Sequence, residues 1–316
     1  MPDTQTPSLA GTRRAPPRLR GILLFAFGLF LFACMDATTK YLAARHEVPL
    51  IVAVRYIVNC LLMVVLVAPS HGRKLVETQR TGLVLVRAGC LAAASLLVGL
   101  ALQRMPVAET TAINFLAPML VVLIAGPLLG ERIGALGWAA AVAGFAGVLL
   151  VVRPGSGLEA IGIACALGAV FANAGYQLLS RTLADSERTL ALLFYTALTG
   201  AILFGLTLPW FWEGRLPGAF EVLLFLSLGV YGGLGHFLFT AAYRHAPASI
   251  LAPMTYFQLV WAGLLGFVVF GHVPDRLSLI GMAVIAASGL VIALKPRRPE
   301  LAGAARREAS AAGDAG

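Results

Sequence analysis

Ten apolar runs, each close to the length of a membrane-spanning helix, fill most of this 316-residue chain. A helix needs about 20 consecutive apolar residues to cross the hydrocarbon core of a bilayer. A lipid-spanning β-strand would alternate apolar and polar residues, whereas these runs are continuous and therefore predict helices. The predicted spans are 21–43, 48–68, 81–103, 107–129, 133–152, 158–181, 189–211, 219–243, 247–270 and 275–294. The expected fold class is an all-α membrane protein with ten transmembrane helices.

The composition agrees with a lipid environment and excludes several other classes. Charged residues make up 12% of the chain, about half of the roughly 25% that is usual in a soluble domain. The net charge of +9 lies in the two ends and a few loops, so it does not predict a nucleic-acid partner. The four cysteines fall inside apolar runs and form no C-x-x-C pair, so neither a metal site nor a disulfide framework is expected.

The two ends of the chain differ from the apolar middle. Residues 1–20 are rich in Pro, Thr and Arg, and residues 297–316 are rich in Ala, Arg and Gly, so both are predicted to be disordered tails. The arginines before the first apolar run resemble the start of a signal peptide. That run continues past Asp36 to Ala43, however, which predicts a retained first span.

The distribution of Lys and Arg predicts the orientation of the chain. With the first tail inside, about sixteen of these residues lie on the inner side and five on the outer side. Cytoplasmic loops of membrane proteins carry this excess of positive charge. Both tails are therefore predicted to be cytoplasmic, in a multi-pass membrane protein.

The last five spans repeat landmarks of the first five at an offset of about 140 residues. The matching pairs are Gly130-Glu131-Arg132 with Gly271-His272-Val273, Gly147-Val148-Leu149-Leu150 with Gly289-Leu290-Val291-Ile292, Arg153-Pro154 with Lys295-Pro296, and Arg104 with Arg244. Five spans is an odd number, so the second copy must insert upside down. The sequence thus predicts two inverted five-helix repeats, 21–153 and 158–296, a construction shared by many secondary transporters.

At these landmarks the chain resembles the drug/metabolite transporter superfamily, EamA type. The motif Pro127-Leu128-Leu129-Gly130-Glu131-Arg132, the Gly-Val-Leu-Leu-Val-Val-Arg-Pro ending at Pro154, and Asp36-Ala37-Thr38-Thr39-Lys40-Tyr41-Leu42 carry the resemblance, which covers about residues 21–296. It implies ten helices, two EamA domains, and export or uptake of a small organic solute. The second copy departs from the pattern, with Gly271-His272 where the first has Gly130-Glu131.

Charges inside spans are costly and are functional candidates by default. Asp36 and Lys40 lie four residues apart on one helix face, and Arg55 sits about seven residues into the second span. Asp36 is a candidate to bind a proton or a cationic group, and Lys40 or Arg55 an anionic group. The alternative is a structural ion pair of Asp36 with Lys40 or Arg55. Glu109, in the first turn of span 4, is interpreted as favouring the positive end of the helix dipole.

Uncharged polar and aromatic residues complete the predicted solute and ion pathway. A cavity lined by spans 1, 4, 6, 8 and 9 is expected, with core packing and hydrogen bonds between helices as the alternative role. His236 is a second proton-carrier candidate beside Asp36, since a histidine titrates near neutral pH. Pro118 and Pro253 are candidate helix breaks in spans 4 and 9. The remaining pathway candidates are Asn114, Asn173, Tyr176, Gln177, Tyr256 and Gln258.

No catalytic or cofactor-binding motif is found, so no enzyme activity and no cofactor is predicted. Without a phosphate-binding loop, transport must draw on a gradient. The function predicted is export of a metabolite or drug by alternating access, with proton antiport as one coupling. Uptake of a vitamin or nucleoside-like metabolite, an intramembrane enzyme and a structural membrane subunit are the alternatives. Monomer and homodimer both remain open.

Overall fold

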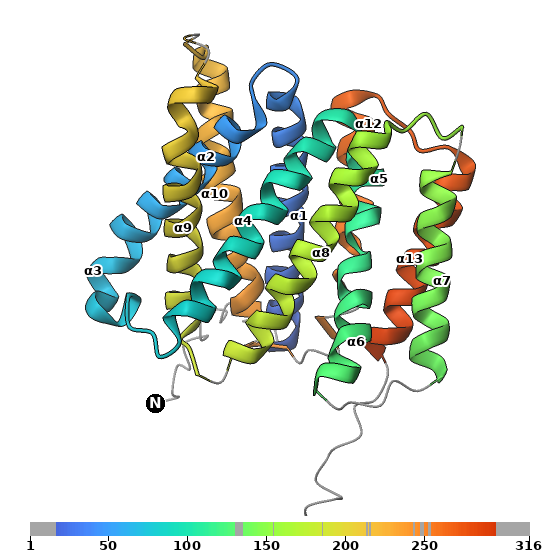
Figure 1. The fold of residues 1–316 in the computed structure, drawn as a ribbon, viewed down its shortest axis with the longest axis horizontal. Helices are drawn as coiled ribbons and strands as arrows, with labels where there is room; N and C mark the ends of the chain where they lie inside the picture. Colours follow the sequence, from blue (N-terminus) through green and yellow to red (C-terminus); the bar gives the residue numbers. More distant parts are fainter. Residues whose placement is uncertain are drawn as a thin grey trace, which may run out of the picture.

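The fold is known from a computed structural model that describes residues 17–129, 135–153, 155–184, 186–212, 214, 216–242, 244–246, 250–251 and 254–294. These residues form helices and no strand (Figure 1). The elements are α1 (Pro17–Ala43), α2 (Val48–Leu62), a π-helical turn η1 (Met63–Val67), α3 (Ala68–His71), a 3-10 turn η2 (Gly72–Leu75), α4 (Thr81–Arg104), α5 (Val107–Asn114), α6 (Leu116–Leu129), α7 (Ala135–Val152), α8 (Ala160–Leu183), α9 (Thr189–Phe211), α10 (Ala219–Ala242), α12 (Phe257–Phe270) and α13 (Arg276–Leu294). The predicted tails lie outside the described residues, except that α1 begins at Pro17 rather than at residue 21. Proline suits the first turn of a helix because the N–H that it lacks has no partner there.

The helices carry the apolar exterior that lipid requires. Six helical stretches in the described chain are long and apolar enough to cross a membrane: 19–43, 48–75, 81–104, 160–183, 189–211 and 219–242. Shorter apolar helices occupy the other predicted spans. Large apolar side chains such as Trp210 (79% exposed) and Leu206 (67% exposed) point outward. Such a surface faces lipid rather than water, and the predicted all-α membrane class is confirmed for the described part of the chain.

Consecutive long helices run in opposite directions, so their connections gather at two ends of the bundle (Figure 1). We call the end with the connections α1–α2, α4–α5, α7–α8, α9–α10 and α12–α13 the upper face, which is at the top of Figure 1. The end with the connections α3–α4 and α8–α9, where α6 also ends and α7 begins, is the lower face. Each helix thereby reaches both faces, except where a span is divided between two shorter elements.

The contacts between helices stay largely the same when each helix is replaced by its counterpart in the other half of the chain. The α4 helix packs against α8 as α1 packs against α10, and α4 packs against α9 as α10 packs against α2. Likewise α1 packs against α12 as α8 packs against α5 and α6. The α2–α9 and α7–α13 contacts each join a helix to its own counterpart in the other half, and the α5–α12 contact joins the matching spans 4 and 9. The helix contacts are therefore largely preserved when residues 17–152 and 160–294 are exchanged.

Glycines let α7 and α13 approach each other closely. A Cβ atom built on Gly147 would lie 2.8 Å from the carbonyl oxygen of Gly281, and one built on Gly281 would lie 2.5 Å from that of Gly147. Small residues of this kind drive the association of helices in membranes, because backbones come within van der Waals contact.

We expect Gly147→Ala to lower the free energy of unfolding by about 1–3 kcal/mol, because a methyl group cannot enter without separating two backbones. Thermal unfolding in detergent measures the change. Gly263→Ala is the matched control, since nothing lies within 4 Å of a Cβ at that position. Equal stability of the two variants would contradict this account of the crossing.

Candidate functional site

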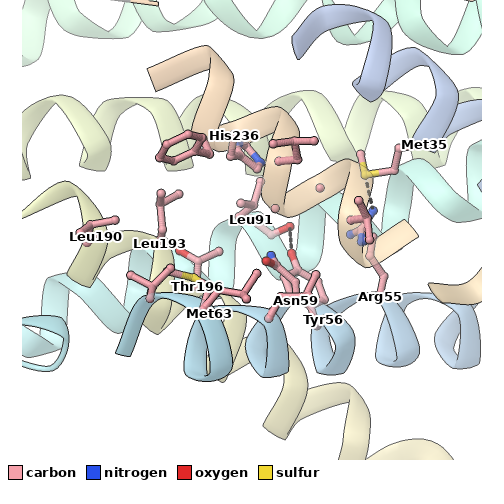
Figure 2. Close-up of a pocket in the computed structure, with 18 of the residues that line it drawn as sticks. Met35, Arg55, Tyr56, Asn59, Met63, Leu91, Leu190, Leu193, Thr196 and His236 are labelled. Carbon is pink, nitrogen blue, oxygen red and sulfur yellow. Dashed lines mark hydrogen bonds between the residues drawn. The ribbon is translucent and has the colours of Figure 1, made fainter. Parts of the chain in front are cut away.

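A cavity of about 450 Å³ lies among α1, α2 with η1, α4, α9 and α10 (Figure 2). Both halves of the chain contribute to its wall. Of the predicted lining spans 1, 4, 6, 8 and 9, spans 1 and 8 (α1 and α10) contribute to this cavity, together with α2, α4 and α9. The described parts of spans 4, 6 and 9 (α5 with α6, α8 and α12) do not line it. The expectation rested on polar residues in the spans, but most of this wall is leucine, valine, methionine and phenylalanine. A volume in this range is typical of sites for small organic molecules.

A π-helical turn shapes the lower part of the cavity. The helix α2 passes into η1, whose residues Met63, Leu66 and Val67 line the wall. Pro69 follows in the first turn of α3 and has no N–H to continue the α-helical ladder. Such single π-turns are frequent at functional sites, because they widen the helix and change which side chains face inward.

Arg55 and Asn59 lie one turn apart on α2 and both face the cavity (Figure 2). The Nη1 atom of Arg55 donates a long hydrogen bond of 3.8 Å to Met35 Sδ, and its guanidinium lies 5.0 Å from the Tyr56 ring. Among the described residues, no other hydrogen bond holds that guanidinium. Its remaining donors are thus open to a molecule in the cavity. Gly233 makes room for Asn59, since a Cβ there would lie 2.8 Å from Asn59 Oδ1.

His236 lies on the α10 wall, across the cavity from Asn59 (Figure 2). Its ring packs edge-on against Phe32 with centroids 4.9 Å apart. A hydrogen bond between the hydroxyls of Tyr56 and Ser95, 2.8 Å long, closes the wall between α2 and α4. Of the predicted pathway residues, Arg55 and His236 are the two that line this cavity.

Asp36 lies next to the cavity, half-buried on α1, within the electrostatic reach of Arg55. The side chain of Gln258, on α12, is close enough to interact with the Asp36 carboxylate. No ion pair within 4 Å joins Asp36 to Arg55 in the described chain. The structure therefore brings three predicted pathway residues together from α1, α2 and α12.

Arg87 on α4 is a functional candidate that the sequence-based prediction did not include. Its side chain is buried (4% exposed) and reaches α8 and α9. The guanidinium donates to Tyr176 Oη at 2.9 Å, Ser180 Oγ at 2.7 Å and Thr196 Oγ1 at 3.0 Å, and to the Leu192 carbonyl. Thr196 lines the cavity, so Arg87 stands directly behind the wall. Its position inside an apolar run was the available signal.

Span 4 is interrupted near the predicted proline. The chain leaves helical geometry at Phe115, between α5 and α6, three residues before Pro118. Proline cannot donate to the carbonyl of residue 114, so the helix breaks in the preceding turn. In span 9, α12 begins only at Phe257, after a turn at Tyr256; Pro253 lies outside the described residues.

The two interruptions meet in the middle of the bundle. The rings of Phe115 and Tyr256 lie 5.0 Å apart, and these residues are separated by 141 positions, which is the repeat offset. Arg55 and Thr196, and likewise Ser95 and His236, are also 141 positions apart and line the same cavity. Residues at the repeat offset therefore meet both at the cavity and at the two interruptions.

Lys40 lies near the upper face rather than in the cavity. Its Nζ atom donates to the carbonyls of Leu102 and Met105 at 2.9 and 2.7 Å, which satisfies the last turn of α4. Glu109 is close enough to interact with it electrostatically. Glu109 is 3% exposed and pairs with His272 Nε2 through Oε1 at 2.9 Å, while its Oε2 is buried without a hydrogen-bond partner in the described chain.

This pairing changes the interpretation of Glu109. It does lie in the first turn of α5, but its side chain makes no cap hydrogen bond and instead joins the two halves of the chain. Gly271, in the left-handed conformation at φ 66°, ends α12 and turns His272 toward it. His272 is the residue at which the second repeat departs from the first.

Further ion pairs on the upper face also join the halves. They are His46 with Glu221 at 3.2 Å, Arg45 with Glu221 at 4.0 Å, Arg104 with Glu159 at 3.6 Å, and Arg153 with Asp275 at 2.9 Å. Asp275 also accepts from the backbone N–H of Ser278, and this bond holds the pKa of the exposed Asp275 carboxyl below its usual range.

Four other predicted residues lie away from the cavity wall. Asn114 donates to the Thr110 carbonyl at 3.0 Å, and its Oδ1 is buried with no hydrogen-bond partner in the described chain. Asn173 and Gln177 lie half-buried on α8, one turn apart and so on one helix face, as the sequence predicts. Tyr176, between them, is the one that binds Arg87.

The bundle and its cavity define a class: a multi-pass membrane protein with two related halves that enclose a site for a small molecule. The sequence pattern of the EamA-like transporter family matches residues 19–153 and again 160–294. The chain therefore belongs to the EamA-like transporter family. The resemblance noted from the sequence is confirmed, and the family is one of transporters rather than enzymes.

Relatives with descriptive names fall into both directions of transport. The S-adenosylmethionine uptake transporter of Rickettsia felis is 25% identical over 87% of this chain and 92% of its own length. The pseudopaline exporter CntI of Pseudomonas aeruginosa (strain UCBPP-PA14) is 30% identical over 86% of this chain and 95% of its own. A solved crystal structure with 21% identity matches 87% of this chain and 96% of that chain with a TM-score of 0.62, which shows a shared fold.

Proposed function

We propose that this protein is a secondary transporter that moves a small organic solute across the bacterial inner membrane by alternating access. The observation that carries the proposal is the cavity of about 450 Å³, which takes its wall from both halves of the chain. A site between two related halves is reached from either side when the halves rock against each other. Family membership supports the same function.

The proposed architecture is ten spans in two inverted repeats of five. The exchange pattern of helix packing supports it, as does the contact of Phe115 with its repeat counterpart Tyr256. The alternation of helix directions in Figure 1, with an odd number of spans in each half, turns the second half over. The repeat boundaries proposed are 21–153 and 158–296.

The arrangement corresponds to a state closed at the upper face. Ion pairs between the halves hold that face together, whereas the cavity extends to Leu66 and Val67 at the end of η1 and to Leu190 in the first turn of α9. Those positions lie toward the lower face. We propose that this state admits the solute from the lower side.

Charge distribution supports a cytoplasmic lower face. The described arginines and lysines there include Arg73, Lys74, Arg80, Arg181 and Arg188. On the upper face, three of the arginines are matched by carboxylates. Positive charge concentrates on the cytoplasmic side of membrane proteins. A membrane-impermeant label on cysteines placed at Lys74 and at Arg104 tests this: only the second should react in intact cells, and the reverse would refute the orientation.

Direction and coupling are part of the proposal. We propose export, following the family resemblance; uptake is the second candidate, because relatives named for uptake match as much of the chain as the named exporter does. Asp36 and His236 are the proposed proton carriers, because they lie beside or on the wall of the cavity.

The test compares cells with and without the protein by mass spectrometry of solutes inside and outside. Accumulation of a solute outside expressing cells is expected for an exporter, and depletion from the medium for an uptake carrier. An unchanged solute profile in both compartments would contradict transport altogether.

We expect Asp36→Asn to abolish acceleration of flux by an imposed pH gradient in proteoliposomes, because the amide cannot exchange a proton. Downhill flux without a gradient should persist. Gln258→Ala serves as the control, since it removes a polar neighbour of Asp36 and leaves the carboxylate. Gradient-driven flux that is equal in Asp36→Asn and the unchanged protein would remove Asp36 from the coupling.

A further inference from the structure

The charged side chains on the cavity wall and directly behind it are positive. Among the described residues that line it, Arg55 is the one with a formal charge, and none is an aspartate or glutamate. A second guanidinium, that of Arg87, hydrogen-bonds the wall residue Thr196 from behind at 3.0 Å. The Asp36 carboxylate lies next to the cavity rather than on its wall, and Gln258 on α12 is close enough to interact with it. A cationic solute would meet these two guanidiniums, and no carboxylate lies on the described wall to receive it.

The unused hydrogen-bonding groups of the wall are mainly donors. An arginine carries five N–H donors, and Met35 Sδ takes one of those of Arg55 in the described chain. The Asn59 side chain, one turn further along α2, adds an amide group without a hydrogen-bond partner among the described residues. Both reach into the cavity from the same wall, with the His236 ring opposite (Figure 2). Two planar donor groups at this spacing suit an oxyanion.

The rest of the wall is apolar. Leu62, Leu91, Leu193, Val230 and Phe237 surround the space between the polar groups and the lower end of the cavity. A molecule that fills it must expose apolar surface over most of its length. We propose that the solute is an organic anion with a single oxyanion head group, which binds Arg55 and Asn59, and with an apolar body that fills the lower part of the cavity. This inference rests on the proposed transport function and specifies its substrate class.

The test uses the full-length protein in proteoliposomes and a small-molecule extract of bacteria. The extract is separated by ion exchange at neutral pH into anionic, cationic and neutral fractions. Each fraction is loaded into the vesicles, and solutes released are identified by mass spectrometry against protein-free vesicles. We expect release from the anionic fraction, of carboxylates or phosphate esters; the masses distinguish these two head groups.

Variants then test whether Arg55 binds the anion. Arg55→Gln should slow release of those anions roughly 10- to 100-fold, since it removes a charge-assisted hydrogen bond from a low-dielectric site. Arg55→Lys should retain part of the rate, because it keeps the charge without the planar fork. The matched control is Arg73→Gln, at an exposed arginine in η2 remote from the cavity, which should release at the unchanged rate.

The outcomes separate this inference from the proposed function. Release confined to cationic or neutral solutes overturns the anion assignment and leaves transport intact. If Arg55→Gln releases anions as fast as the unchanged protein does, Arg55 is not the residue that binds them. No release from any fraction, in vesicles loaded from either side, contradicts transport and this inference together. If Arg55→Gln does not fold, the fraction that the unchanged protein releases still decides the class.

Discussion

Arg87→Ala is expected to lower the free energy of unfolding by about 3–5 kcal/mol and to stop transport. The change removes a buried guanidinium that joins α4 to α8 and α9 through four hydrogen bonds. It also leaves Tyr176 and the Leu192 carbonyl without those donors inside a membrane, where no water replaces them. Losses of this size are typical when one group of a buried polar network is deleted. Unfolding in detergent and flux in proteoliposomes measure the two effects.

Arg87→Met separates the contribution of charge from that of packing. Methionine keeps much of the volume and needs no hydrogen bonds, so it should unfold at a free energy closer to that of the unchanged protein. Flux should nevertheless fall, since the positive charge behind Thr196 is gone. Arg80→Ala is the control, at an exposed arginine that should change stability by no more than about 0.5 kcal/mol. If Arg87→Ala proves as stable as Arg80→Ala, the network does not hold these helices together.

Glu109→Ala is expected to open the upper face. The variant loses the 2.9 Å pair with His272 and the carboxylate near Lys40, both of which hold α1 and α5 to the end of α12. A hydrogen bond to a charged group contributes about 1.5–3 kcal/mol, and each 1.4 kcal/mol changes a conformational equilibrium about tenfold. The population open at the upper face should therefore rise roughly 10- to 100-fold.

A cysteine at Leu91, on the wall of the cavity, reports the change in a background without the four native cysteines. Its reaction with an impermeant maleimide is measured from each side of membrane vesicles. Glu109→Ala should raise the rate from the upper side and lower it from the other. Glu159→Ala is the matched control: its pair with Arg104 is on the same face but its side chain is 52% exposed, and exposed pairs contribute little. Equal rates in both variants would mean that Glu109 does not keep this face closed.

Predictions from the chain alone were most accurate where they depended on local pattern. Apolar runs of sufficient length gave the helical membrane class, and Pro118 gave the interruption of span 4 to within three residues. Asp36, Arg55 and His236 were named because charge and imidazole are costly in lipid, and the structure places all three on or beside the cavity.

Predictions failed or were incomplete where partners lie far apart in the chain. The residues that bind Arg87 are 89–109 positions away, so nothing near it in sequence distinguishes it from a charge at a span edge. Lys40 was assigned to the pathway from its spacing to Asp36, but it caps α4 from across the bundle. Glu109 resembled a helix-terminus charge because its partner His272 lies 163 residues later.

The amino-acid sequence by itself determined that this chain is a helical membrane protein built from two related halves, because apolar length and repeat offset are properties of order along the chain. Only the tertiary structure decided which helices line the cavity, which guanidinium faces the cavity and which stands behind it, and which carboxylate joins the two halves at the upper face. Those outcomes depend on contacts between helices more than 80 residues apart. Packing in three dimensions determines such contacts, and a local sequence pattern carries no information about it.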